Sequence, residues 1–588
     1  MERTYSKKSR YIIVLVFCIA CMVILNQSFV FFADGNMHEK IVMVLNVLCL
    51  VLIPFVFAFV KPFTRLTDYL MYRFACFADA VKRHRKKIGI YGLAVVVAYL
   101  LSLFAEYCVV SRVLKTPANA SRQIMIFAIF LLCVVIYAFR ERAGKRPELF
   151  FAVTALVLGG MLILVSPATL GVMVDDETHY ARMLAEANFL DGTRLSAEHR
   201  LTIEYQKTMF EKFAYDRESR AAYYDDINRV YESKEVAMTN VYFHGIWSPC
   251  YIPSAIGTVL GQGLGISFVH VFMLGKFFNL LFYVMLFYFA IQKIRYGKVL
   301  LATIGLLPTN IFMASNYSYD PWLIGFVALS YAYFFYEVQT PEQKLSTKNV
   351  VLMLVFLLLG CLPKAVYCVL GLPFLFMPKQ KFASKKQRLW YYMPVLVAGL
   401  ALAGTFLIPA LLHGVGTGDV RGGEGINATE QLANILHNPA DYMRVLLHFL
   451  KSYLSVDNAE NYLQTFFYFG TGTFTGVAIV VLWVVAVLDR SGDACMTPAV
   501  RISGVVASLA AVAACATVMY IVYTPVGSEE IFGCQGRYIL PAVFPFLMSV
   551  VPDRVRNEIN PNVFVIVPLT LLSGTFMYNI YNLCISLY

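Results

Sequence analysis

The chain has 588 residues, of which 59% are hydrophobic and 15% charged, with 49 Lys and Arg against 37 Asp and Glu. A soluble domain carries about 25% charged residues, so this composition excludes an ordinary soluble protein and indicates a polytopic membrane protein. The apolar runs are continuous rather than alternating, which excludes an outer-membrane barrel and leaves helices as the spanning elements. The net charge of +12 comes from Lys and Arg grouped between the runs. Because this is the positive-inside pattern, we expect the lipid bilayer as a partner and no nucleic acid.

Residues 1–147 are predicted to form a four-span extension, with spans near 11–32, 41–60, 88–110 and 123–139. Basic residues gather in the segments 1–10, 61–87 and 140–146. The positive-inside rule places these segments, and the N-terminus, in the cytoplasm. A further span at 148–168 then carries the chain to the external face.

Residues 148–588 are predicted to form the core of an all-α polytopic protein, with about 11 spans of its own. The first external loop, 169–247, is expected to hold short amphipathic helices on the membrane surface. Segment 250–266 is short and glycine-rich, so a re-entrant or interfacial helix is expected. The second external loop, 413–462, is glycine-rich and is predicted to be a lid over the acceptor. The remaining spans are predicted near 268–290, 299–315, 320–338, 349–361, 364–378, 390–412, 463–488, 501–523, 538–552 and 562–585.

The stretch V-D-D-E-T-H-Y at 174–180 places Asp175, Asp176, Glu177 and His179 directly after a span. On a helix Asp175 and His179 share one face, and a carboxylate beside an imidazole suits acid–base chemistry or a divalent metal. A helix N-cap is the alternative, because acidic residues favour the first turn. Three acids exceed what a cap needs, and charge at a membrane boundary is kept mainly for function.

Three other segments are predicted to reach the same face. Asp320 stands at the start of a span, where helix capping is the alternative interpretation. Lys364 lies between two short apolar helices, where snorkelling is the alternative. The stretch G-C-Q-G-R-Y-I-L-P places Gln535, Arg537 and Tyr538 at an external boundary, where arginine is unusual. A guanidinium suits phosphate oxygens, although an ion pair with an acid would also explain it.

Acids and cations from different loops would then surround one site that borders hydrocarbon. A lipid-borne phosphate with a polar headgroup would satisfy such a site. The cations would hold the phosphate leaving group, and an acid would take the proton from an incoming hydroxyl.

These motifs resemble those of the GT-C class of membrane glycosyltransferases and, more narrowly, a family of bacterial polytopic proteins of unknown function. That family shows P-D-E-x-x-H-F where this chain has V-D-D-E-T-H-Y, so Val174 stands for the proline and Asp176 for the glutamate. The family's N-x-x-D turn is matched from Asn316 to Asp320 with one extra residue. Its lysine between short helices is matched by Lys364.

The most specific match is the family's V-Q-G-R-Y-x-x-P, which this chain has as C-Q-G-R-Y-I-L-P at 534–541. The resemblance covers about residues 148–552. It implies an inverting GT-C enzyme of a bacterial cytoplasmic membrane, active on the external face. Such an enzyme moves a sugar from a polyprenyl-phosphate-type lipid donor to an extracytoplasmic glycan acceptor of the cell envelope.

The resemblance also implies roles for the candidate residues. The general base would be Asp175 or Asp176, and a divalent metal (Mg²⁺ or Mn²⁺) on Asp176, His179 and Asp320 is an open alternative. A transporter or flippase of lipid-linked saccharides is the alternative function, because it would use the same groove without a base. The candidate substrate-binding residues are Glu177, His179, His244, Asp320, Lys364, Gln535, Arg537 and Tyr538.

Overall fold

The computed structural model describes residues 6–25, 51–187, 194–198, 200–201, 217–237, 248–414, 416, 418–464, 466, 472–490, 496–552, 555 and 557–582. Most of these residues form helices, joined by turns and loops, and one antiparallel pair of two-residue strands is present, β1 (Arg194–Leu195) and β2 (Val236–Ala237). Among the described residues, six helical stretches are long and apolar enough to cross a membrane: Val81–Val113, Ala120–Phe139, Pro147–Val165, Phe268–Lys293, Pro498–Tyr523 and Pro561–Ile580. The expected all-α polytopic membrane fold is therefore confirmed.

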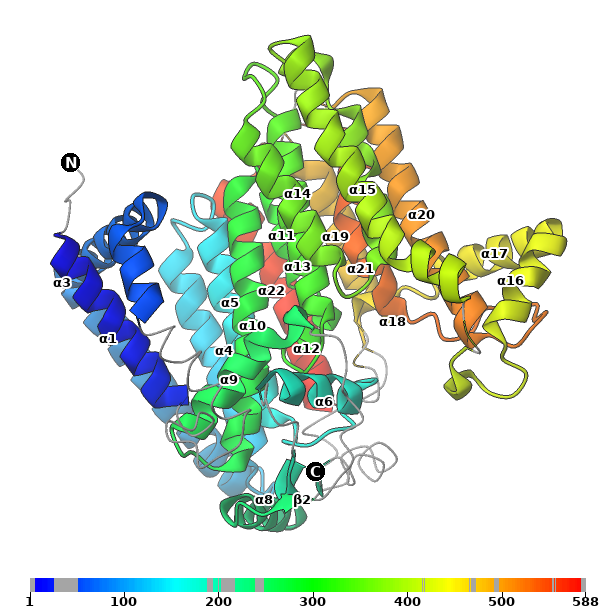
Figure 1. Cartoon of the computed structure of the whole chain (residues 1–588). Coiled ribbons are helices and arrows are strands. Elements are labelled where there is room, and N and C mark those ends of the chain that lie inside the picture. Colours follow the sequence, from blue (N-terminus) through cyan, green and yellow to red (C-terminus); the bar gives the residue numbers. More distant parts are fainter. Residues whose placement is uncertain are drawn as a thin grey trace, which may run out of the picture.

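The N-terminal helices lie at one side of the molecule, where Figure 1 shows α1 and α3 in blue. The basic segment 61–87, expected to separate two spans, is helical and continuous with the apolar residues that follow. Between Phe63 and Ile88 no Gly or Pro interrupts it, and Lys and Arg are good helix formers. The predicted spans 11–32 and 41–60 lie partly outside the described residues. The helices here are α1 (Lys7–Leu25), α3 (Lys61–Leu103), the π-helix η1 (Phe104–Val113) and α4 (Ala120–Phe139).

The centre of the bundle is built around one long helix, α10 (Phe268–Lys293), which packs against its neighbours on several sides. Gly159 and Gly325 allow the neighbouring helices to approach closely because neither residue has a Cβ. A Cβ on Gly159 would lie 2.5 Å from Leu280, and one on Gly325 would lie 2.6 Å from Leu286. These neighbours are α5 (Pro147–Val165), α9 (Ile252–Gly263, preceded by the 3-10 turn η2, Pro249–Tyr251) and α13 (Asp320–Val338), with α14 (Thr347–Cys361) beyond α13.

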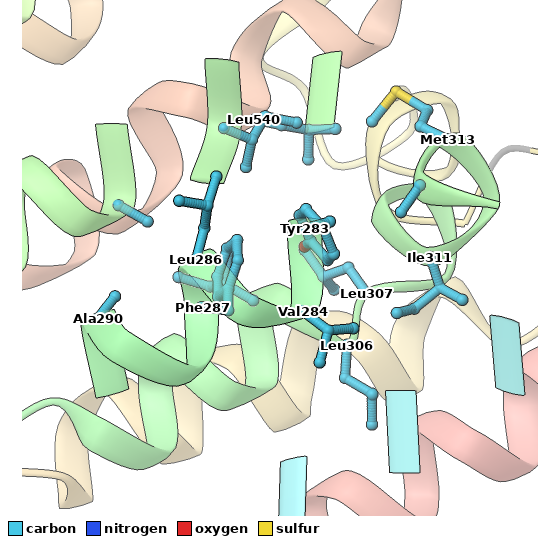
Figure 2. Close-up of a cluster of buried hydrophobic side chains, with 14 of the residues drawn as sticks. Tyr283, Val284, Leu286, Phe287, Ala290, Leu306, Leu307, Ile311, Met313 and Leu540 are labelled. Atoms are coloured by element: carbon cyan, nitrogen blue, oxygen red, sulfur yellow. The ribbon is translucent and has the colours of Figure 1, made fainter. Parts of the chain in front are cut away.

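The hydrophobic core joins elements that are far apart in the sequence. Figure 2 shows Tyr283 and Phe287 of α10 in one cluster with Ile311 and with Leu540, the first residue of α21 (Leu540–Val550). All four side chains are buried. This shared core fixes the start of α21 relative to the central helices.

Two predicted spans are broken. The span 299–315 consists of α11 (Lys298–Gly305) and α12 (Pro308–Ala314), because Pro308 disfavours helical backbone in the residue before it. Within the span 463–488, the described residues form helix in α18 (Glu460–Leu463) and α19 (Thr475–Leu488). Gly472 lies against the Gln464 carbonyl, and Phe474 has a positive φ of 64°, so α19 starts only after them.

The second half of the bundle contains one unusual element. The predicted span 364–378 is the 3-10 helix η3 (Ala365–Phe376), which contains Pro373 and packs on α20 and α15. The remaining elements here are the short turn η4 (Lys379–Lys381), α15 (Lys385–His413), α20 (Pro498–Tyr523), the 3-10 turn η7 (Gly536–Ile539) that leads into α21, and α22 (Pro561–Ile580).

Both predicted loops contain helices. In Figure 1, α6 runs across one end of the bundle, while α16 and α17 project beside α20. Helix α9 has 12 residues and reaches about 18 Å, less than the hydrocarbon thickness of about 30 Å. This length agrees with the re-entrant interpretation of 250–266. The loop elements are α6 (Asp176–Ala187), α8 (Arg217–Glu232), the 3-10 turn η5 (Val420–Gly422), α16 (Ala428–His437) and α17 (Pro439–Tyr453).

Candidate functional site

The site begins in the loop between α5 and α6, which Asp176 closes. The Asp176 carboxylate is buried and accepts hydrogen bonds from the backbone N–H groups of Gly171 (3.0 Å), Val172 (3.0 Å) and Met173 (3.1 Å). Burial raises the pKa of Asp176 to about 7, against the lowering effect of these bonds and of the Lys276 charge. Asp176 therefore shapes the loop.

Asp175 points to different partners from its neighbour. Its φ of 61° is left-handed, a conformation that Asp tolerates better than most residues. One carboxylate oxygen lies 3.0 Å from Nη1 of Arg421, and the other lies 3.5 Å from Nη2 of Arg537. The two adjacent acids thus have separate surroundings, which the sequence pattern did not distinguish.

Arg537 links the loop after α5 to the start of α13. Its side chain is 1% exposed, and its Nε lies 3.4 Å from a carboxylate oxygen of Asp320. The same Asp320 oxygen accepts a hydrogen bond from the Ser318 hydroxyl (2.9 Å). Arg537 therefore contacts two carboxylates, Asp175 and Asp320, that are 145 positions apart in the chain (320 − 175).

The Q-G-R-Y turn that carries Arg537 is held on both sides. The Tyr453 hydroxyl donates to the Gln535 carbonyl (2.7 Å), and the Tyr367 hydroxyl donates to the Tyr538 carbonyl (2.7 Å). A Cβ on Gly536 would lie 2.1 Å from the carbonyl oxygen of Asn461. The glycine of this motif is therefore required by close backbone packing.

Lys364 adds a second cation beside this turn. Its ammonium lies 3.4 Å from the ring centroid of Tyr538 and 5.5 Å from that of Tyr319. Aromatic faces attract cations electrostatically. Lys364 is in none of the ion pairs found among the described residues. An anionic ligand would therefore meet an ammonium group that is held by the aromatic rings of Tyr319 and Tyr538.

His179 lies on the buried side of α6, next to the same cluster. Its Nδ1 is 2.7 Å from the Tyr251 hydroxyl, and its ring packs edge-on against Tyr319. Burial, together with the positive charge of Arg537, lowers the pKa of His179 to about 3, so the imidazole is neutral. Its Nε2 is buried and has no hydrogen-bond partner among the residues that the structure describes.

Other predicted residues are less well connected. Glu177, in the first turn of α6, accepts a hydrogen bond from its neighbour Thr178, and its Oε2 has no partner among the described residues. The side-chain oxygen of Gln535 is likewise buried without a partner in that part of the chain. His244 lies outside the described residues.

The predicted metal ligands do not form a metal site. No group of three His, Cys, Asp or Glu side chains that could hold a metal occurs among the described residues. The set Asp176, His179 and Asp320 fails because both Asp176 oxygens face backbone N–H groups of its own loop.

Sequence reasoning missed Arg421. It comes from the glycine-rich segment before α16, within the loop expected to be a lid, and contacts Asp175. An available signal was its place in a segment predicted to be external, where arginine is unusual. The same argument had singled out Arg537.

Comparison with known proteins gives one match. No curated protein and no solved structure matches the chain. A family model matches residues 156–545, well over half of the chain, and includes Asp175, Asp320, Lys364 and Arg537. The chain therefore belongs to the family described as "Predicted membrane protein (DUF2142)".

Proposed function

We propose that the protein is an inverting glycosyltransferase that uses a polyprenyl-phosphate-linked sugar as donor and an extracytoplasmic glycan as acceptor. The observation that carries this proposal is a charged cluster together with an apolar cavity whose lining comes within two residues of it along the chain. The cluster is Asp175, Asp320, Arg537 and Lys364. The cavity has a volume of about 320 Å³, and its lining includes Ile539, two residues after Arg537.

The cavity is suited to a lipid chain. Its walls come from α18, α19, α20, α21 and nearby residues, and they are almost entirely apolar, with Leu482, Trp483, Val512 and Phe546 among them. A water-soluble phosphate would gain nothing from such walls, whereas burial of apolar surface favours a lipid by roughly 25 cal/mol per Å². The guanidinium and ammonium groups of the cluster would hold the phosphate of the same molecule.

The reaction needs one base and one stabilised leaving group. The acceptor oxygen attacks the anomeric carbon while the bond from that carbon to the phosphate oxygen breaks. The lipid phosphate leaves with the bonding electron pair and is stabilised by Arg537 and Lys364. The acceptor proton passes to a carboxylate on the opposite face of the sugar.

Asp175 is the better candidate for that carboxylate. Its side chain is 30% exposed and therefore open to a substrate, whereas Asp176 is 3% exposed and faces the loop backbone. A base must lie within hydrogen-bond reach of the proton that it removes. His179, with a neutral imidazole and an unpartnered Nε2 among the described residues, is placed to orient the sugar or the acceptor.

The test compares Asp175→Asn with Asp441→Asn in nanodiscs that contain the full chain. Asp441 is an exposed control on α17, paired with Arg444. With a panel of polyprenyl-phosphate-linked sugars and an envelope glycan extract, the assay measures released polyprenyl phosphate. Asp175→Asn should lower the rate by at least about 100-fold and still bind polyprenyl phosphate, while Asp441→Asn stays unchanged.

Normal transfer by Asp175→Asn would contradict the proposed base. If the wild type released no polyprenyl phosphate but moved lipid-linked saccharides across sealed vesicles, the flippase alternative would replace the transferase.

A further inference from the structure

We infer that Arg421 and Arg537 together form a seat for an oxyanion, that Asp175 fills this seat in the ligand-free protein, and that the phosphate of the lipid substrate displaces it. The inference rests on the proposed function, because it describes how the same site takes its donor. It adds Arg421 to the binding residues and gives the glycine-rich segment a phosphate-side role.

Asp175 bridges the two arginines. Its two oxygens contact guanidinium groups from distant parts of the chain, Arg421 at 3.0 Å and Arg537 at 3.5 Å. An anion with two oxygens thus already lies between two arginines. A phosphate also presents several oxygens, and guanidinium groups bind it through paired hydrogen bonds.

Asp419 holds the Arg421 guanidinium in a fixed orientation toward Asp175. The Arg421 Nε lies 3.0 Å from one oxygen of Asp419, and its Nη2 lies 2.6 Å from the other. This edge-on pair fixes the plane of the guanidinium and leaves Nη1 directed at Asp175. The Arg421 side chain is 59% exposed, so its orientation depends on this pair and on its contact with Asp175.

The segment that carries Arg421 packs against the C-terminal end of α20. The Asp419 N–H donates to the Val522 carbonyl (2.7 Å), and the Tyr523 hydroxyl donates to the Arg421 carbonyl (3.2 Å). A Cβ on Gly422 would lie 2.1 Å from the Tyr523 carbonyl oxygen. Only glycine fits at this position, so the sequence V-R-G-G serves to bring Arg421 close to α20.

The consequence is a coupling between donor binding and the base. In the ligand-free protein both Asp175 oxygens are engaged by guanidinium groups. A phosphate that takes over these guanidinium groups frees Asp175 to accept a proton from the acceptor. The base is then released only when the leaving group is in place.

The experiment measures binding of a polyprenyl monophosphate, and in a parallel arm of inorganic phosphate, to the full chain in nanodiscs by calorimetry. Asp175→Asn and Asp419→Asn each remove one negative charge beside Arg421, but the seat predicts opposite effects. Asp175→Asn should tighten lipid-phosphate binding about tenfold because it removes the resident occupant. Asp419→Asn should weaken it about threefold, and Arg421→Ala about tenfold, because the guanidinium loses its aim or is absent.

Arg444→Ala is the matched control, since Arg444 is an exposed arginine in the same loop whose ion pair, with Asp441, is on its own helix. It should change binding by less than about twofold. Thermal unfolding of each variant checks that the fold is intact.

If both aspartate variants bound the lipid phosphate more tightly, the loss of negative charge alone would explain the effect, and the proposed seat would be overturned. Unchanged binding by Arg421→Ala would also overturn it. Equal affinity for inorganic phosphate would overturn the lipid phosphate as its ligand. Opposite signs together with normal transfer by Asp175→Asn would leave the seat standing and remove only the proposed base. Opposite signs with no release of polyprenyl phosphate by the wild type would leave the seat standing and remove the proposed transferase, so the failures are distinguishable.

Discussion

The two arginines that contact Asp175 are held in opposite ways. The Arg537 side chain is 1% exposed and is carried by a short turn that two tyrosine hydroxyls fix to the bundle. The Arg421 side chain is 59% exposed and is carried by a glycine-rich segment at the end of α20. The difference shows that one partner of the carboxylate is part of the core, whereas the other can respond to a ligand.

The largest effect should come from Arg537→Ala. It leaves the buried Asp320 without its guanidinium, and breaking a buried ion pair costs about 3–5 kcal/mol. Arg421→Ala removes two solvent-accessible pairs, with Asp175 and Asp419, and should cost less than about 1 kcal/mol. Denaturant unfolding of both variants in the same detergent gives the comparison, and similar losses would mean that both arginines belong to the core.

Next in size is Asp176→Asn. Its amide oxygen could still accept from Val172 and Met173, but its NH₂ group would face the N–H of Gly171. An unsatisfied buried donor costs about 1–3 kcal/mol, so we expect a loss of about 2 kcal/mol in unfolding free energy.

Asp175→Asn is the neighbouring control, and it should change the unfolding free energy by less than about 1 kcal/mol. Asn also tolerates the left-handed backbone at this position. A greater loss for Asp175→Asn than for Asp176→Asn would reverse the assignment of the structural and the reactive carboxylate.

Much of the fold follows from the sequence because apolar runs of sufficient length have few alternatives in a bilayer. The expected spans 148–168, 268–290 and 501–523 match α5, α10 and α20 closely. The misjudged spans share a cause. Pro308 and the positive φ of Phe474 break helices inside apolar runs, and a hydropathy pattern carries no information about backbone conformation.

The candidate site was only partly predictable. Residue types and positions pointed to Asp175 and Arg537, which the structure places 3.5 Å apart. The pattern could not separate Asp175 from Asp176, because that difference lies in backbone hydrogen bonds at Gly171, Val172 and Met173.

A pH-dependent effect of similar or smaller size should come from His179. Its folded pKa of about 3 lies below its ordinary value of 6.5, so the unfolded chain binds a proton that the folded protein does not. This difference lowers stability as pH falls below 6.5, by about 1.4 kcal/mol per unit. Between pH 7 and pH 5 His179 alone should cost the wild type about 2 kcal/mol relative to His179→Gln, as unfolding of both proteins at both pH values would show.

The exposed His437 on α16 provides the control, and His437→Gln should follow the wild type at both pH values. Since Asp320, Arg537, Arg182 and Lys364 also surround His179, the informative quantity is the difference between variant and wild type. If the wild type and His179→Gln differed by the same unfolding free energy at pH 7 and at pH 5, the imidazole would become protonated in the folded protein. His179 would then carry charge in the site.

The smallest effect on stability, and the sharpest on the exposed arginine, is predicted for Gly422→Ala. The added methyl would meet the Tyr523 carbonyl oxygen, so the segment that carries Arg421 must move away from α20. The cost is limited to the segment's own hydrogen bonds, about 1 kcal/mol, yet lipid-phosphate binding should weaken as much as in Arg421→Ala. Gly476→Ala, where the new Cβ meets nothing within 4 Å beyond its own stretch of helix, should leave lipid-phosphate binding unchanged. If Gly422→Ala kept wild-type affinity, the position of Arg421 would not depend on this docking, and the contrast between a fixed and an adjustable arginine would fail.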